Sequence, residues 1–135
     1  MLVLTLHPVA LACVAILSLL IFGLGLAVSV ARGKAKVLIG VTGDPNAMLN
    51  RLVRAHGNTT EYAPFLAILF LVHGALNPSL LILSLMVIGT AARAVFALGL
   101  VTAGSLSRPA PLRFVGALGT YVVGIWLSVL LFWQI

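Results

Sequence analysis

The chain has 135 residues, of which 62% are hydrophobic and only 7% are charged, and its mean hydropathy is +1.25. Soluble domains carry roughly a quarter of their residues as charged side chains, so this composition excludes an ordinary water-soluble protein. It indicates an integral membrane protein, and the length suits one domain spanning residues 1–135. The net charge of +6 does not indicate nucleic-acid binding, because excess Lys and Arg in a membrane protein first reports topology.

Four apolar segments follow one another along the chain, and each reaches or approaches the roughly 20 residues that cross a bilayer as a helix. We expect them at about 6–31, 58–76, 79–103 and 114–133, with the second helix starting earlier, near Ala47. Backbone groups in lipid must find their hydrogen-bond partners within the protein. The predicted fold is therefore an all-α membrane protein, a bundle of four transmembrane helices.

The connections between these segments predict the orientation. Residues 32–50 form a basic, turn-rich loop, the link between the second and third helices is a tight turn at Asn77, and a second basic segment spans residues 104–113. Seven of the eight Lys and Arg residues lie in or beside the two basic loops. The positive-inside rule then places both loops in the cytoplasm and both termini outside.

The first half of the second helix carries an unusual concentration of polar side chains. At about 100° per residue, one face covering roughly a third of the helix circumference holds Arg51, Arg54, Asn58, Glu61, Tyr62 and Phe65. His56 lies on a different face. Snorkelling at the membrane surface explains the two arginines. It does not explain Glu61, because an unpaired carboxylate facing lipid would cost several kcal/mol, so we expect this face to point inward.

Arg93 supports an inward-facing site. It lies in the third helix among small residues, about 15 Å from the cytoplasmic end of that helix. A cation at that depth needs a partner, and Glu61 is the carboxylate at comparable depth. We therefore predict an Arg93–Glu61 ion pair. No His, Cys, Asp and Glu side chains have the spacing of a metal site, so no metal is expected.

These residues together predict a basic pocket at the cytoplasmic face, with one carboxylate and several amide or hydroxyl groups. Guanidinium groups pair well with carboxylates, and an arginine beside a thiol favours the thiolate by lowering the pKa of that thiol. Glutathione, which has two carboxylates, one amine and one thiol, fits such a pocket. Composition alone does not select it over a phospholipid headgroup.

The run RLVRAHGNTTEYAP at residues 51–64 resembles the signature of the MAPEG family, the membrane-associated proteins in eicosanoid and glutathione metabolism. Arg93 matches an arginine in the third helix of that family, and RPAPLR at residues 108–113 is similar to its basic segment before the fourth helix. Chain length, helix number and charge asymmetry agree with the family along essentially the whole chain. The chain resembles a compact prokaryotic member of the family, so the resemblance implies a bacterial inner membrane as its location.

The resemblance implies a homotrimer that binds glutathione, as co-substrate, between neighbouring subunits near the cytoplasmic face. By position, it implies a set of glutathione-site residues: Arg54, Asn58, Glu61 and Tyr62 as contacts, His56 as a neighbour across the interface, Arg51 at the rim, and Arg93 paired with Glu61. It implies that the catalytic arginine, which activates the thiol, is Arg108 or Arg113. A one-residue gap in the alignment with the family leaves both assignments open.

Two positions depart from the family pattern. Where eicosanoid-forming members carry a tyrosine or histidine and then a further tyrosine, this chain has Phe96 and Leu100. These departures argue against leukotriene or prostaglandin synthesis.

Three hypotheses follow. The first is a glutathione transferase or peroxidase that uses an arginine-stabilised thiolate against lipophilic electrophiles arriving from the membrane lipids. The second is a non-catalytic MAPEG-like protein that binds glutathione or lipid. The third is a small proton-coupled exporter that depends on Glu61.

Overall fold

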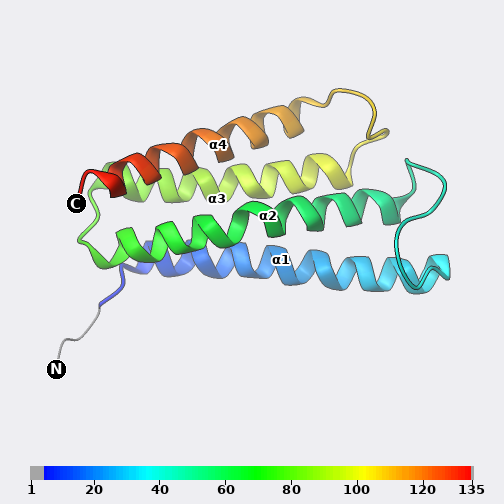
Figure 1. Ribbon diagram of the computed structural model, residues 1–135, viewed down its shortest axis with the longest axis horizontal. Coiled ribbons are helices and arrows are strands. Elements are labelled where there is room, and N and C mark those ends of the chain that lie inside the picture. The colour runs from blue at the N-terminus through cyan, green and yellow to red at the C-terminus, as the bar shows by residue number, and fades with distance from the viewer. Residues whose placement is uncertain (1–4, 135) are drawn as a thin grey trace.

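The computed structural model describes residues 5–134. Within them the chain forms four helices, each antiparallel to the next (Figure 1). They are α1 (Pro8–Ala35), α2 (Met48–Ala75), α3 (Leu80–Val101) and α4 (Pro111–Phe132). No strand occurs within these described residues. The predicted all-α, four-helix fold is confirmed.

Local sequence signals account for most of the helix ends. Pro8 and Pro111 occupy the first turns of α1 and α4, where a missing N–H costs nothing. The Nδ1 atom of His7 accepts a hydrogen bond from the backbone at the start of α1, and Ser79 caps α3 in the same way, as its position predicts. α1 ends at Lys36, whose φ of 54° turns the chain out of the helix.

The second helix differs from the other three in composition. By length and apolar character, three helices of the described chain could cross a membrane, namely α1, α3 and α4. α2 is as long as α1 and begins at Met48, close to the expected start. Its first half carries the polar residues of the 51–64 run, so its mean hydropathy is lower. The four expected helices are all present, and α1, α3 and α4 are the three that have the length and apolar character of a membrane span.

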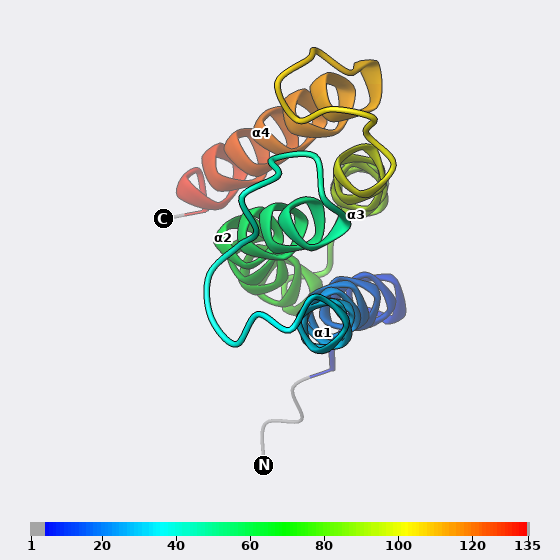
Figure 2. The same ribbon diagram turned by 90° about the vertical axis from the view of Figure 1, so that its right-hand side faces the viewer.

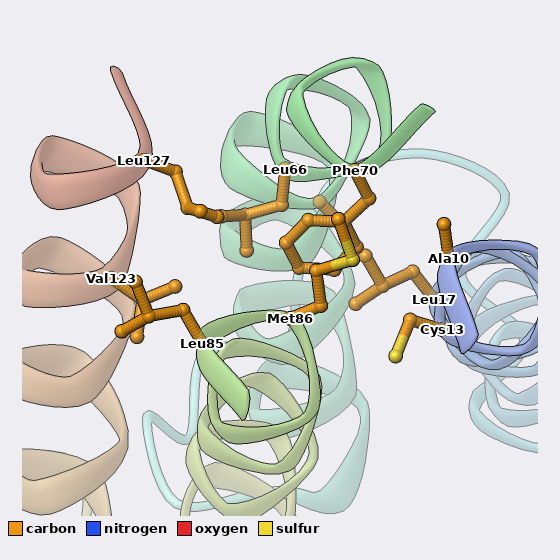
Figure 3. Packing of buried hydrophobic residues seen from close by; sticks show 10 residues of the cluster. Ala10, Cys13, Leu17, Leu66, Phe70, Leu85, Met86, Val123 and Leu127 are labelled. Carbon is orange, nitrogen blue, oxygen red and sulfur yellow. The ribbon is translucent and has the colours of Figure 1, made fainter. Parts of the chain in front are cut away.

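The larger of two buried apolar clusters lies in the half of the bundle near the chain termini. Leu17 of α1, Phe70 of α2, Met86 of α3 and Leu127 of α4 are almost completely buried there and point toward one another (Figure 3). Every helix contributes to this layer, so it holds the four-helix arrangement together. The other half holds a smaller buried apolar cluster of Val28, Leu49 and Leu52, together with polar residues of α2 and α3.

The two basic connections lie at the same end of the bundle, while the α2–α3 turn and the chain ends lie at the other (Figure 1). Seen from the loop end, α1 and α4 are on opposite sides of α2 and α3 (Figure 2). α4 packs mainly against α3 and touches α2 only lightly. That arrangement leaves space along one side of the α2–α4 pair.

Candidate functional site

A buried arginine organises the polar interior. Arg93 is only 1% exposed, and its Nη2 atom donates to Oδ1 of Asn58 at 2.9 Å and to Oγ1 of Thr59 at 3.4 Å. Its Nη1 atom donates to Oγ1 of Thr120 on α4 at 3.5 Å. The guanidinium also lies 4.9 Å from the ring centroid of Phe96. These residues, which we call the Arg93 cluster, join α2, α3 and α4.

The predicted Arg93–Glu61 ion pair is wrong. Among the described residues, the partners of the guanidinium are neutral oxygens and aromatic rings, and Asn58 lies between it and the carboxylate. The Nδ2 atom of Asn58 donates to Oε2 of Glu61 at 3.5 Å. Glu61 itself is exposed at the surface of the protomer, because its position on α2 turns it away from α3. The amide of Asn58 therefore bridges the guanidinium of Arg93 and the carboxylate of Glu61.

Tyr121 of α4 is a site residue that reasoning from the sequence missed. Its hydroxyl lies 3.3 Å from the hydroxyl of Tyr62, and the two rings meet edge to face with centroids 5.5 Å apart. Tyr62 also lies beside the guanidinium of Arg93, 5.4 Å from its ring centroid. The chain has only two tyrosines. Because Tyr62 lies in the polar run of α2, the sequence offered one hint that Tyr121 would lie near the same site.

The two tyrosines and Glu61 form one end of an apolar groove between α2 and α4. The groove has a volume of about 710 Å³. We call it the α2–α4 groove. Its walls include Leu66, Leu69, Gly124, Ile125, Val129 and Phe132. This volume falls within the range of roughly 300–1,000 Å³ that is typical of small-molecule sites.

Two arginines from separate parts of the chain meet at the loop end. Arg54 of α2 and Arg113 of α4 both line a hollow of about 490 Å³ between the two basic loops, which we call the basic hollow. The Nη1 atom of Arg113 donates to the carbonyls of Leu106 at 3.0 Å and of Arg108 at 3.2 Å. Arg108 is exposed and lines a different hollow on the loop itself. Of the two candidate catalytic arginines, Arg113 is therefore the one near Arg54.

Arg51 and His56 make contacts within the bundle instead. The Nη1 atom of Arg51 donates to the carbonyls of Val101 at 3.0 Å and Ala103 at 2.7 Å, so it satisfies the C-terminus of α3. His56 packs on α1, where a Cβ on Gly25 would lie 3.2 Å from its Nε2 atom. The ligand and interface roles that the resemblance implied for both residues stay predictions.

The chain matches a known protein family over most of its length. The model of the MAPEG family matches residues 10–133, a range that includes α1 from Ala10 onward, all of α2, α3 and α4, the Arg93 cluster and the basic hollow. The chain belongs to the MAPEG family. No curated protein and no solved structure matches it. In this MAPEG protein, the polar run of α2 lies within the matched residues.

Proposed function

We propose that this MAPEG protein is a membrane-bound glutathione transferase or peroxidase that acts on lipophilic electrophiles. MAPEG membership supports the coarse assignment, because the family includes glutathione transferases and peroxidases. The observation that carries the proposal is the meeting of Arg54 and Arg113 in one hollow, on the same side of α2 as Asn58 and Glu61. This arrangement offers cations for carboxylates at one end and a carboxylate for an amine at the other.

The spacing along α2 suits an extended zwitterion. Arg54 and Glu61 are seven residues apart, which places them on nearly the same helix face and about 10 Å apart along the axis. Arg54 would pair with a carboxylate of glutathione, Glu61 with its amine, and the Nδ2 atom of Asn58 would donate to a ligand oxygen. Each such charge-assisted contact contributes on the order of 1.5–3 kcal/mol.

Arg113 is the residue that we assign to the thiol. A guanidinium beside the sulfur favours the thiolate, which is the nucleophile, by lowering the pKa of the thiol. With a substrate arriving from the lipid, the thiolate would either add to the β-carbon of an unsaturated carbonyl, whose α-carbon then takes up a proton, or attack a hydroperoxide oxygen. The second reaction breaks the O–O bond and releases the alcohol after protonation, and a second glutathione converts the resulting sulfenic acid into the disulfide and water. We further propose that the protein works as a homotrimer in a bacterial inner membrane, with glutathione between subunits and both basic loops in the cytoplasm.

One observation favours the second hypothesis, a MAPEG-like protein that binds glutathione or lipid without chemistry. The Nη1 atom of Arg113 is already bonded to two loop carbonyls. If its other nitrogens are also held away from the thiol, the arginine would order the loop and activate nothing. The experiment below separates the two functions.

The test is calorimetric binding of glutathione to the detergent-purified protein, combined with the ultraviolet absorbance of the bound thiolate. We expect binding with a thiolate signal in the wild type. Arg54→Gln should weaken binding by about ten-fold or more, because it removes a charge-assisted contact. Arg113→Gln should keep most of the binding and lose the thiolate signal.

Lys36→Asn serves as the matched control. It removes one positive charge from the same end of the protein, and Asn tolerates the positive φ of that position. Binding by Arg54→Gln equal to that of the control would refute the basic hollow as the glutathione site. Binding by the wild type without a thiolate signal would favour the non-catalytic function.

A further inference from the structure

The connection between α1 and α2 exposes two large apolar side chains next to each other, which we call the apolar pair. Leu38 is 97% exposed and Ile39 is 85% exposed, more than any other large apolar side chain of the described residues. Apolar side chains on the outer faces of the helices can meet hydrocarbon, but these two lie in a loop beyond the end of α1. Adjacent exposed apolar residues in such a place indicate an interaction surface.

The segment that carries the apolar pair is held against the end of α1. Lys36 has a φ of 54°, which turns the chain out of the helix. Val37 then packs inward against the smaller buried apolar cluster, and the Nη2 atom of Arg32 donates to the carbonyl of Gly40 at 3.4 Å. The segment therefore folds back beside the last turn of α1, with the apolar pair at its tip (Figure 1).

The residues after this tip are bound to α2. The Nδ2 atom of Asn50, which is buried in the first turn of α2, donates to the carbonyls of Thr42 at 2.9 Å and of Asp44 at 2.8 Å. Its Oδ1 atom accepts from the backbone nitrogen of Thr42 at 2.9 Å. Both ends of the tip are thus fixed to helices before any partner binds, and a pre-ordered segment loses little conformational entropy on binding.

The tip lies at the level of the lipid headgroups. α1 has 28 residues, so it is about 42 Å long, which is close to the roughly 40–45 Å of a bilayer with its headgroups. Because the chain folds back at the end of α1, the apolar pair lies at this level and not further out in water. Seen from the loop end, the segment after α1 curves outward, away from α3 and α4 (Figure 2).

Two lysines give this surface a positive charge. Lys34 and Lys36 precede the apolar pair, and both are exposed. The one carboxylate of the loop, that of Asp44, accepts from the backbone nitrogen of Asn46 at 2.9 Å. Apolar side chains beside exposed lysines fit an anionic lipid surface, because the apolar groups enter between the headgroups while the amines attract the phosphates. A second copy of this chain is a poorer match, because its loop end is also basic.

We propose that the apolar pair inserts into the headgroup layer of the adjacent leaflet and that Lys34 and Lys36 bind anionic phospholipids there. The loop thereby anchors this end of the bundle to the membrane surface, and this role is independent of the proposed glutathione chemistry. Val41, which follows the tip, lines the basic hollow. The anchor therefore also holds one wall of that hollow at the membrane surface.

The test is lipid quenching of a fluorophore on the tip of the full-length protein, in the absence of glutathione. In a Cys13→Ala background, Leu38→Cys, Ile39→Cys and Asn46→Cys are each labelled with an NBD fluorophore in detergent. The labelled proteins are then reconstituted into liposomes of phosphatidylcholine and phosphatidylglycerol. Position 46 is the matched control, because it is exposed in the same loop but lies beyond the tip. Lipids that carry a nitroxide near the headgroup should quench positions 38 and 39 several-fold more strongly than position 46.

Moving the nitroxide from one lipid to the other shows which headgroup lies at the tip. For the label at position 39, quenching should be about two- to fivefold stronger from phosphatidylglycerol than from phosphatidylcholine at equal mole fractions. Lys34→Gln and Lys36→Asn should each reduce this preference, and together they should abolish it. Arg108→Gln is the charge control, because it removes one exposed positive charge from the other basic loop and should leave the preference unchanged.

Three results would overturn the proposal. Equal quenching at positions 39 and 46 would place the tip in water. A blue-shifted emission at position 39 that no lipid nitroxide quenches would show that a neighbouring subunit covers the tip. Equal quenching by the two lipids, unchanged by the lysine variants, would exclude an anionic lipid site. Because no glutathione is present, a failure here leaves the proposed function standing, and a protein that does not bind glutathione could still show the anchored tip.

Discussion

At the scale of single residues, Arg93 shows how a cation can be buried without a carboxylate. Asn58, Thr59 and Thr120 supply neutral oxygens, and the rings of Tyr62 and Phe96 add cation–π contacts. Because Oδ1 of Asn58 accepts from Arg93, its Nδ2 atom must point toward Glu61. The guanidinium therefore sets the orientation of the amide that faces the candidate site.

Replacing Arg93 should destabilise the protein moderately. Arg93→Met keeps most of the side-chain volume but leaves the buried oxygens of Asn58 and Thr59 without a donor, which should cost roughly 1–3 kcal/mol of unfolding free energy. Thermal unfolding in detergent measures the change. Arg54→Met is the control, because Arg54 is exposed and its loss should change stability by about 0.5 kcal/mol or less. Equal midpoints for both variants would show that the Arg93 cluster adds no net stability.

At the scale of elements, the contact between α3 and α4 is the tightest in the bundle. A Cβ on Gly116 would lie 2.5 Å from the backbone nitrogen of Phe96, and one on Gly99 would lie 2.9 Å from that of Arg113. Such close approach needs small residues, as is common between membrane helices. Phe96 packs between this contact and the guanidinium of Arg93, so it serves packing and offers no hydrogen bond.

Widening this contact should be costly. Gly116→Ala must push the backbones of α3 and α4 apart, because the conflicting atoms belong to the main chain, and we expect a loss of about 1–3 kcal/mol. Gly23→Ala on α1 has open space around its Cβ position, so it should be neutral or stabilise its helix by up to about 1 kcal/mol. Chemical or thermal unfolding of the two variants gives the comparison. An unchanged free energy of unfolding for Gly116→Ala would mean that α4 can shift away from α3 without destabilising the protein.

At the scale of the whole molecule, polarity is divided between the two ends of the bundle. The larger apolar cluster lies near the chain termini, whereas the basic hollow, the Arg51 contact with α3 and both basic loops lie at the other end. Only Arg93, among the Lys and Arg residues, lies away from the loop end. By the positive-inside rule, this division predicts that the loop end of the bundle faces the cytoplasm.

Cysteine labelling in intact cells tests the orientation. In a Cys13→Ala background, a membrane-impermeant maleimide should label Gln134→Cys at the C-terminal end, which we predict to lie outside. It should leave Ile39→Cys and Ser107→Cys unlabelled, because both basic loops are predicted to be cytoplasmic. Permeabilised cells, in which all three variants should react, provide the control. Labelling of the loop positions in intact cells would reverse the topology and move the glutathione site to the outer face.

The sequence by itself determined the class of the protein, the number and approximate bounds of its helices and the family. Composition, apolar runs and the 51–64 run are local properties, so they could be predicted before any helix was packed. The grouping of the two basic loops at one end followed equally, because four consecutive spans must alternate in direction. The agreement of the family match over residues 10–133 reflects the same local information.

Only the tertiary structure decided which polar side chains meet. It placed Asn58 rather than Glu61 against Arg93, directed Arg51 to the end of α3, brought Arg113 rather than Arg108 beside Arg54, and added Tyr121. Each outcome depends on the rotation and tilt of one helix against another. Periodicity assigns a residue to a face of its own helix, but the packing of Gly99 and Gly116 sets how α3 and α4 approach and thus which faces come together.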